Sequence, residues 1–515
     1  MLNEILNSNS LFRDNISIWL LLVVSILVFA IRYNYTRNRP PLPPGPFFTF
    51  PVLGHLPLLG KWPHLQMYKL AQRYGPIASL KLGSSFAVVL NDYKIIHQTF
   101  KLKGEIFSDR TLNNPFYLTA EKSLAGTNGW QWAEHRKFFD KYLKKTGLGG
   151  SNYDEKIMEE VTCFLNQCEQ RQKKDDKNGT EGIDFENDLA ISVANNTCLL
   201  VFGKRFDYND PHFLNLLKNE NELTILYNTS GILYFLPYLT KLLSLFLLAP
   251  GLKKLRQLAK EFDKFSESLV KDHLFSTNKF VKDDYIFNFL EEKKRREMEG
   301  IEDKVFTYPW LTGILHALYG GGVETAFNVI RFAILAIIRQ PDLQKKIHEE
   351  LDRAIGNRNV TINDRRLTPL TWATLLEILR ITTPLPLSIP RSNRKEVVVE
   401  GYRIPKGSYI IPNLFYIHHD PKLWKDPFEF RPERFIVNGE VVKCPYLIPF
   451  GVGKRSCPGE VLGNAEDFLY FASMMQHYEF QSPIEIQHLP PLVADRPSLV
   501  PGCPSYKVIM KRRNL

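Results

Sequence analysis

The chain has 515 residues and a formal net charge of +11, with 44% apolar and 23% charged residues. This balance is ordinary for a globular protein with a full core, and the length predicts several domains or one unusually large one. The positive charge suits an anionic membrane surface or an acidic protein partner. No dense Lys/Arg stripe with interleaved aromatic residues occurs, which argues against nucleic-acid binding.

The number and spacing of the cysteines argue against several classes of protein. The six cysteines are too few and too scattered for a disulfide framework. No Cys-x-x-Cys pair occurs, which argues against a structural zinc site and against covalently attached c-type haem. We therefore expect the body of the protein to lie in a reducing compartment.

An uncharged apolar run, residues 16–31, lies near the N-terminus. As a helix it would be about 24 Å long, short of the ~30 Å hydrocarbon core, so flanking residues would have to help it span. A cleaved signal peptide fits such a run equally well. However, no small-x-small cleavage site follows, and Arg32, Arg37 and Arg39 come directly after the run. We therefore predict that residues 1–31 form a single-pass signal anchor, with the following chain on the cytoplasmic side.

Residues 32–46 are basic and rich in proline. Five of the eight residues from Arg39 to Pro46 are proline, which fixes φ and lacks a backbone donor. This segment is expected to be a stiff hinge between the anchor and the body, residues 47–515.

The body contains both strand and helix patterns. Residues 77–82 and 86–90 are short β-type runs separated by Gly-Ser-Ser, which predicts a hairpin. Residues 397–399 and 409–411 predict two more strands, joined by a turn-rich connector at 401–407. Residues 154–290 are mostly helical in pattern.

Residues 231–251 form a second long apolar stretch. Pro237 and Lys241 within it argue against a second transmembrane span. A buried core helix explains the stretch about as well as a loop that dips into the membrane. An exposed apolar patch of this size would otherwise be a liability.

One long helix, about 50 Å if unbroken, is predicted for residues 306–339. Three consecutive glycines at 320–322 would each cost about 1 kcal/mol relative to alanine. We therefore expect a local opening of the helical hydrogen bonds, or a ligand packed against the backbone. Glu324 and Thr325 follow at once, and an acid beside an alcohol in a loosened helix can relay protons.

Two further groups of polar residues lie in the C-terminal half. Glu377 and Arg380 stand three apart among apolar neighbours and predict a buried ion pair, because buried opposite charges must pair or destabilise the fold. A surface pair worth a few tenths of a kcal/mol is the ordinary alternative. His418, His419 and Asp420 have the side chains of metal ligands, but a plain loop explains them better.

The most informative stretch is residues 450–460, Phe-Gly-Val-Gly-Lys-Arg-Ser-Cys-Pro-Gly-Glu. Its glycines allow a flat partner to approach the main chain closely. Exposed N–H groups and the nearby guanidinium of Arg455 would stabilise Cys457 as the metal-binding thiolate. A helix predicted over residues 460–478 would add its N-terminal dipole. By composition alone, a glycine-rich turn with an incidental cysteine is about equally probable.

The full pattern resembles the haem-ligand signature of the cytochrome P450 family, Phe-x-x-Gly-x-Arg-x-Cys-x-Gly. The matching positions are Phe450, Gly453, Arg455, Cys457 and Gly459. The resemblance implies that Cys457 is the axial ligand of the iron of haem b, with the other four positions around the haem. Thiolate ligation favours O–O cleavage. The resemblance also implies a helical prism with a smaller β-rich lobe, so residues 47–515 would be one haem-thiolate catalytic domain.

The resemblance assigns roles to residues elsewhere in the chain. Trp132 and Arg136, four apart on a predicted helix, look like the pair that contacts a haem propionate, although an ordinary surface pair has the same spacing. Arg391 lies where family members often place a propionate ligand. Residues 321–325, Gly-Gly-Val-Glu-Thr, resemble the oxygen-activating motif, with Ala326 where a second Thr is frequent. Glu324 and Thr325 would therefore be the catalytic acid and alcohol.

Glu377 and Arg380 resemble the Glu-x-x-Arg pair of the family, whose third member would be Arg434. The implied role of these three residues is structural, in the core beside the haem. The chain departs most from the family pattern at residues 178–251, the region in which substrate specificity usually resides.

The resemblance implies a microsomal monooxygenase that inserts one atom of O2 into a lipophilic small molecule such as a sterol, a fatty acid or a xenobiotic. Electrons would come from NADPH through NADPH–cytochrome P450 reductase, with cytochrome b5 as a second donor, because the chain lacks a convincing nucleotide-binding glycine motif. The lysines at 137, 141, 144 and 145 would dock the donor, or simply form a solvated helix face.

The implied location is the endoplasmic reticulum membrane, with the catalytic domain in the cytoplasm and in contact with membrane lipid. Two other functions also fit a haem-thiolate chain. One is an isomerase or dehydratase that acts on peroxides without a reductase, although such relatives typically lose the acid–alcohol pair. The other is a non-enzymatic haem sensor or carrier.

Overall fold

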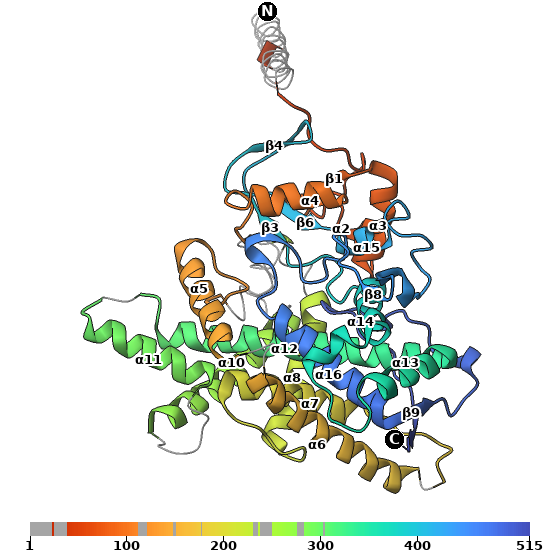
Figure 1. Cartoon of the computed structure of the whole chain (residues 1–515). Helices are drawn as coiled ribbons and strands as arrows, with labels where there is room; N and C mark the ends of the chain where they lie inside the picture. The colour runs from red at the N-terminus through yellow and green to blue at the C-terminus, as the bar shows by residue number, and fades with distance from the viewer. Residues whose placement is uncertain are drawn as a thin grey trace, which may run out of the picture.

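The computed structural model describes residues 23–24, 39–111, 121–147, 151–176, 178–229, 235–236, 250–275, 283–301 and 304–514. These residues form a large helical part and a smaller β-rich lobe, which lies at the upper end of the molecule in Figure 1. The prediction of a mainly helical protein with a β-rich lobe is confirmed. The predicted anchor lies outside the described residues except for Val23 and Val24, and so does most of the apolar stretch 231–251.

The helices and strands of the described residues have the following bounds. The helices are α2 (Leu56–Leu59), α3 (Pro63–Tyr74), α4 (Tyr93–His97), the π-helix η1 (Gln98–Leu102), α5 (Gly129–Lys145), α6 (Ser151–Asp175), α7 (Glu186–Phe202), α8 (Pro211–Thr229), α10 (Pro250–Phe275), α11 (Tyr285–Met298), α12 (Tyr308–Arg339), α13 (Pro341–Ala354), η4 (Ile362–Arg366), α14 (Pro369–Thr382), α15 (Leu414–His419), η5 (Pro432–Phe435), η6 (Gly453–Arg455), α16 (Glu460–His477) and η7 (Ile486–His488). The strands are β1 (Ile77–Leu82), β2 (Ser85–Leu90), β3 (Arg391–Ser392), β4 (Val397–Val399), β5 (Tyr402–Ile404), β6 (Tyr409–Pro412), β7 (Ile436–Val437), β8 (Glu440–Val441), β9 (Tyr478–Gln481) and β10 (Ile509–Arg512).

The β-rich lobe is built on a four-stranded sheet in the order β1–β2–β6–β3. β1 and β2 are the predicted hairpin, paired antiparallel from Ile77 opposite Leu90 to Leu82 opposite Ser85. β2 pairs parallel with β6, and β6 pairs antiparallel with β3, whose first residue is Arg391. The sheet therefore holds Arg391 beside segments from the N-terminal part of the chain.

The connector between β4 and β6 is more ordered than the sequence predicted. Within it, β5 pairs antiparallel with β4. Glu400 and Gly401 between the two strands both have positive φ, 49° and 78°, which is the backbone shape of a tight hairpin turn. The turn-rich prediction for residues 401–407 missed this strand because three residues are too few to show periodicity.

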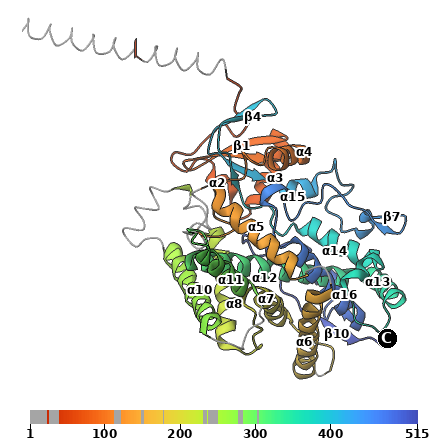
Figure 2. The same cartoon turned by 60° about the vertical axis from the view of Figure 1, so that its left-hand side comes forward.

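α12 runs through the middle of the helical part in both views (Figures 1 and 2). Pro309 lies in its first turn, and Pro341 follows its C-cap, Gln340, which are the positions where proline is tolerated or stops a helix. α7, α10, α14 and α16 pack against it. Among the described helices, α12 passes the length and hydropathy test for a membrane span, but 78% of its most apolar window is buried. α12 is therefore the central core helix.

The three glycines do not interrupt α12. The helix is continuous through residues 320–322, so the predicted opening is wrong. A Cβ at Gly320 would overlap the carboxylate of Glu220, and a Cβ at Gly322 would lie 2.6 Å from Oγ1 of Thr197. These two glycines therefore make room for polar side chains of α8 and α7. A Cβ at Gly321 would meet nothing within 4 Å, so the space beside this third glycine is open.

Candidate functional site

Cys457 lies in the loop that leads from η6 into α16. The N–H of Cys457 donates to the carbonyl of Phe450 at 2.8 Å, which closes the loop. Gly451 and Gly453 within it have φ values of 71° and 77°, a region that favours glycine. The predicted helix after the cysteine is α16, and Cys457 stands just before its first turn.

Gly453 brings the cysteine loop against the main chain of η1. A Cβ at Gly453 would overlap the carbonyl oxygen of Phe100, whereas a Cβ at Gly451 would meet nothing within 4 Å. At Gly459 a Cβ would make an ordinary contact with Sγ of Cys457, at 3.8 Å. Gly453 therefore serves a backbone–backbone contact between the cysteine loop and η1.

The side chain of Cys457 is exposed. The surrounding protein nevertheless raises the pKa of its thiol, with burial as the largest cause. The Gly459 N–H and the Arg136 guanidinium lower this pKa. The guanidinium that favours the thiolate is thus Arg136, not Arg455 as the sequence predicted. Because burial outweighs both, a bound metal ion would have to displace the thiol proton.

Trp132 and Arg136 lie on α5, as predicted, but they have different surroundings. Arg136 forms an ion pair with Asp140 at 2.9 Å and donates to the carbonyl of Ser456 at 2.8 Å. This places Arg136 on the cysteine side of the site. Trp132 is buried, and the guanidinium of Arg455 lies over its ring, 3.9 Å from the centroid. Trp132 and Arg455 therefore form a second, separate pair.

Arg455 points away from the sulfur and into the contact between the cysteine loop and the β-rich lobe. It donates to the carbonyls of Ser108 at 2.8 Å and Leu124 at 3.1 Å. Burial, together with the charges of Arg110 and Arg391, lowers the pKa of Arg455 to about 8. The side chain is therefore a buried cation near other cations.

Arg110 and Arg391 complete this group. Arg391 lies over the ring of Phe100, 3.9 Å from the centroid, and donates to the carbonyl of Val452 at 2.7 Å. Arg110 donates to the carbonyl of Pro390 at 2.9 Å. Burial lowers the pKa of Arg110 to about 10, and burial with the charge of Arg110 lowers the pKa of Arg391 well below its usual value.

The three arginines lack a balancing acid. Within the described part of the chain, none of them forms an ion pair with Asp or Glu, and the nearby Asp109 pairs with Arg394 at 2.8 Å. Nη1 of Arg391 is buried without a hydrogen-bond partner among those residues. Buried charges need partners, and guanidinium groups match carboxylates in shape. The arginine cluster, Arg110, Arg391 and Arg455, therefore fits the two propionate carboxylates of haem.

Glu324 and Thr325 lie on α12 next to the open space at Gly321. The hydroxyl of Thr325 donates to the carbonyl of Gly321 at 2.9 Å. Burial raises the pKa of Glu324 to about 7, although a hydrogen bond from Thr224 and the charge of Arg496 lower it. An acid with a pKa near neutral can both hold and release protons under working conditions.

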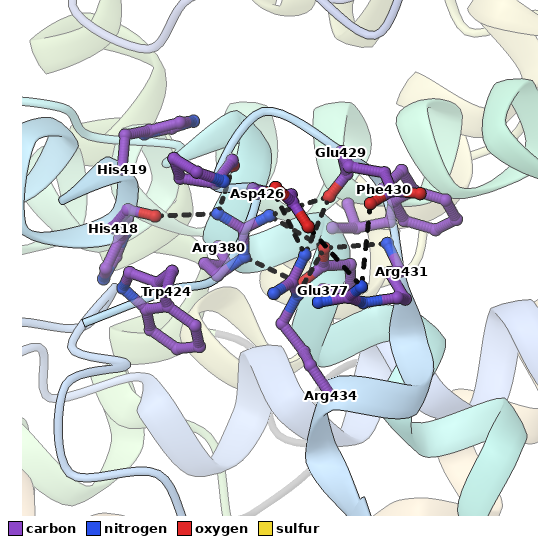
Figure 3. Close-up of polar contacts among 12 residues, drawn as sticks. Glu377, Arg380, His418, His419, Trp424, Asp426, Glu429, Phe430, Arg431 and Arg434 are labelled. Atoms are coloured by element: carbon purple, nitrogen blue, oxygen red, sulfur yellow. Dashed lines mark hydrogen bonds and ion pairs between the residues drawn. The ribbon is translucent and has the colours of Figure 1, made fainter. Parts of the chain in front are cut away.

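Glu377, Arg380 and Arg434 meet in a buried network (Figure 3). Arg380 contacts both carboxylate oxygens of Glu377, at 2.7 and 2.8 Å, and both side chains are fully buried. Arg434 donates to Glu377 at 3.0 Å. Arg380 also donates to the carbonyls of His418 and Pro427, both at 2.7 Å. The network ties α14 to the chain that leads to the cysteine loop.

His418 and His419 make structural hydrogen bonds. Nε2 of His418 accepts from the backbone N–H of Ile448 at 3.0 Å, so its Nδ1 carries the proton and faces Oγ1 of Thr383 at 2.9 Å. Nδ1 of His419 contacts the carbonyl of Phe415 at 2.8 Å. Over the described residues, no group of three or more His, Cys, Asp or Glu is placed to hold a metal ion. Both histidines lie in α15, and Asp420 is its C-cap, so the loop prediction is wrong at His418 and His419.

Two polar residues of the site, Arg110 and Glu220, were not predicted from the sequence. Arg110 follows Ser-Asp in a loop, and Glu220 lies in a helical segment with no motif. Their roles depend on side chains far along the chain. No local sequence pattern predicts such a residue, because its burial depends on segments that are distant in sequence.

The helical fold, the cysteine loop and the arginine cluster are the features expected of a protein that binds haem through a cysteine. The family model for Cytochrome P450 matches residues 43–507. The chain is 32% identical to human cytochrome P450 2U1 over 468 residues, which cover 88% of this chain and 81% of the human protein. It is 31% identical to Drosophila melanogaster cytochrome P450 18a1 over 510 residues, with 96% and 91% covered. It is 30% identical to cytochrome P450 1A1 of Canis lupus familiaris over 455 residues, with 86% and 85% covered.

The chain belongs to the cytochrome P450 family. It is therefore an oxidoreductase of the monooxygenase class, and haem is its cofactor. The predicted family and the mainly helical fold are confirmed.

Proposed function

We propose that this protein is a membrane-anchored monooxygenase that inserts one atom of O2 into a lipophilic small molecule, such as a sterol or steroid, a fatty acid or a xenobiotic. The observation that carries the proposal is the group of three buried, unbalanced arginines that adjoins the loop of Cys457. Cys457 would bind the haem iron, and the arginine cluster would hold the propionates. Phe450, Gly453 and Gly459 shape the loop around the ligand.

When bound, haem supplies dioxygen activation and oxygen transfer. The residues of the chain position the reactants and hold protons. Glu324 holds a proton near neutral pH, and Thr325 presents its hydroxyl beside the open space at Gly321. Glu377, Arg380 and Arg434 have a structural role, because they make ion pairs with one another in the buried network.

The electrons come from NADPH through NADPH–cytochrome P450 reductase, with cytochrome b5 as a second donor. Lys137, Lys141 and Lys144 are exposed on α5, and Arg136 of the same helix donates to Ser456, next to Cys457. A negatively charged donor that binds these lysines would approach the sulfur side of the haem. Complementary charge of this kind steers association.

Residues 1–31 form the anchor in the endoplasmic reticulum membrane, residues 32–46 the hinge, and residues 47–515 a cytoplasmic catalytic domain. Directly after the hinge, Phe47, Phe48 and Val52 are exposed, with Phe47 fully so at 103% and Val52 at 76%. Neighbouring apolar side chains exposed in this way favour contact with a lipid surface.

The proposal is tested with the full-length protein in phospholipid nanodiscs. Purified reductase, NADPH, isotopically labelled O2 and a panel of sterols, fatty acids and xenobiotics are added, after a first screen for ligand-induced shifts of the haem spectrum. We expect one labelled oxygen atom in the product and no product without reductase. Turnover of a lipid hydroperoxide without reductase would instead establish an isomerase or dehydratase, and absence of any turnover a sensor or carrier.

Substitution of Thr325 by alanine is expected to separate NADPH oxidation from product formation. A positioned proton donor contributes about 10²–10⁴-fold to a rate, so most of the NADPH consumed should end in hydrogen peroxide. The measurement is the ratio of product and of peroxide to NADPH oxidised. Thr325→Ser keeps the hydroxyl and is expected to restore most of the ratio. An unchanged ratio in Thr325→Ala would place the proton path elsewhere.

A further inference from the structure

A line of polar side chains crosses the contact between α8 and α12. On α12, His316, Gly320 and Glu324 stand four residues apart and share one face of the helix. On α8, Glu220 and Thr224 also stand four apart. Glu220, Thr224 and His316 are buried, with exposed fractions of 7%, 5% and 4%. We call these five residues the polar seam.

Glu220 lies at the middle of the polar seam. Its carboxylate packs on the backbone of Gly320, since a Cβ there would overlap Oε1 of the acid. Its Oε2 is 3.8 Å from Nε2 of His316. One turn further along α8, the hydroxyl of Thr224 donates to the carbonyl of Asn221 at 2.9 Å and lies close enough to Glu324 to lower the pKa of that acid. α8 therefore brings a second acid and an alcohol onto the face of α12 that carries the first acid.

The two carboxyl groups affect each other. Burial raises the pKa of Glu220 to about 8, and the negative charge of Glu324 adds to this shift. Burial raises the pKa of Glu324 to about 7 against the opposing effects of Thr224 and Arg496. Among the described residues, Oε2 of Glu324 is buried without a hydrogen-bond partner. The polar seam thus holds two acids, and ionisation of either one disfavours ionisation of the other.

Other groups face the polar seam from each neighbouring element. Tyr319 of α12 has its pKa raised by burial and by the charges of Cys198 and Glu220, and within the described residues its buried hydroxyl has no hydrogen-bond partner. Phe262 of α10 stacks on His316 with ring centroids 4.2 Å apart. Arg496 from the C-terminal loop lowers the pKa of Glu324 but also pairs with Glu186, at 3.4 Å. A cation that already pairs with Glu186 does not balance the ionised forms of both Glu220 and Glu324.

We propose that Glu220 is a positioning residue for proton delivery, which forms with Glu324 a coupled carboxyl pair that holds one proton at neutral pH. The inference rests on the proposed function, in which Glu324 supplies protons to Thr325. Two neighbouring carboxyl groups in a buried site do not ionise independently. When Glu220 is ionised, its charge favours the protonated form of Glu324. The pair therefore keeps a proton that a lone acid beside Arg496 would release.

The test is an infrared titration of the haem-loaded, full-length protein, in which the band of protonated carboxyl groups is followed across the neutral range. We expect two separate steps from the pair in the unmodified protein, recognised as the two that change in Glu220→Gln or in Glu324→Gln. Glu324→Gln should leave one step, that of Glu220, at a pH about one unit or more below the upper step of the unmodified protein, since coupling of this size produces separate macroscopic values. An upper step that stays at its original pH in Glu324→Gln would overturn the proposal.

Two matched pairs of variants keep the test specific. Gly320→Ala should displace the Glu220 carboxylate and merge the two steps, whereas Gly321→Ala changes helix propensity equally and meets no neighbour. Glu220→Gln should leave one step, whereas Glu222→Gln removes a carboxyl of α8 that pairs with Lys254 at 3.3 Å outside the seam and should leave both. Equal titrations of Gly320→Ala and Gly321→Ala would contradict the proposal.

A catalytic readout separates this inference from the proposed function. Glu220→Gln should shift the pH dependence of product formed per NADPH oxidised, while Glu222→Gln should not. Two coupled infrared steps without reductase-dependent turnover would refute the proposed function and leave the carboxyl pair established. Turnover with uncoupled titrations, and with the same pH dependence in Glu220→Gln, would refute the pair alone.

Discussion

Replacement of Glu377 by alanine is expected to lower the free energy of unfolding by about 3–5 kcal/mol, because it leaves the buried cation of Arg380 without its counter-charge. Arg380 is fully buried and cannot turn toward water. The substitution also removes the acceptor for Arg434 and for the backbone N–H of Arg431, at 3.0 and 2.9 Å. Since whole domains are stable by only about 5–15 kcal/mol, the variant should unfold at a much lower denaturant concentration.

Glu429→Ala is the matched control within the same cluster (Figure 3). The carboxylate of Glu429 is 58% exposed and lies 3.7 Å from Arg431, so its loss should cost at most about 1 kcal/mol. Chemical unfolding followed by tryptophan fluorescence measures both variants. Equal losses of stability in Glu377→Ala and Glu429→Ala would show that the buried ion pair does not hold this part of the fold together.

Gly453→Ala is expected to abolish most haem binding. A residue with a Cβ at φ 77° is strained by about 1–3 kcal/mol. In addition, the Cβ would overlap the carbonyl oxygen of Phe100, so the main chain of the cysteine loop or of η1 must move. A combined cost above about 3 kcal/mol corresponds to a more than hundredfold loss of affinity.

Gly451→Ala separates the two causes, because Gly451 has a similar φ of 71° and open space around it. It should show the strain without the overlap and retain more haem. The measurement is haem bound per mole of purified protein, together with the thermal unfolding midpoint. Similar haem contents in the two variants would mean that the contact with Phe100 does not position the loop.

The elements that depend on local sequence alone could be predicted. The hairpin of β1 and β2 follows from two β-type runs around a Gly-Ser-Ser turn, and α12 follows from the long helical pattern of residues 306–339. The cysteine loop was predicted because several fixed residue types occur within ten positions.

Features that depend on distant side chains were missed or misread. The helix-breaking cost of Gly320 is real, but the pattern does not show that an acid of α8 needs the space. Arg110 has no motif, and the cluster with Arg391 and Arg455 forms only when the β-rich lobe folds against the cysteine loop. The prediction that Arg455 stabilises the Cys457 thiolate was wrong for the same reason. Proximity in sequence to Cys457 does not determine where the long side chain of Arg455 points.

The absorption spectrum of the reduced, carbon monoxide-bound protein tests most directly the claim that Cys457 binds haem, since the spectrum reports whether a thiolate is bound to the iron. The unmodified full-length protein should show the strongly red-shifted band of thiolate-ligated haem, and Cys457→Ala should lose it. Cys444→Ala, which removes a partly buried cysteine earlier in the chain, should retain the band. A colourless purified protein, or an unchanged band in Cys457→Ala, would contradict the assignment of Cys457 as the haem ligand.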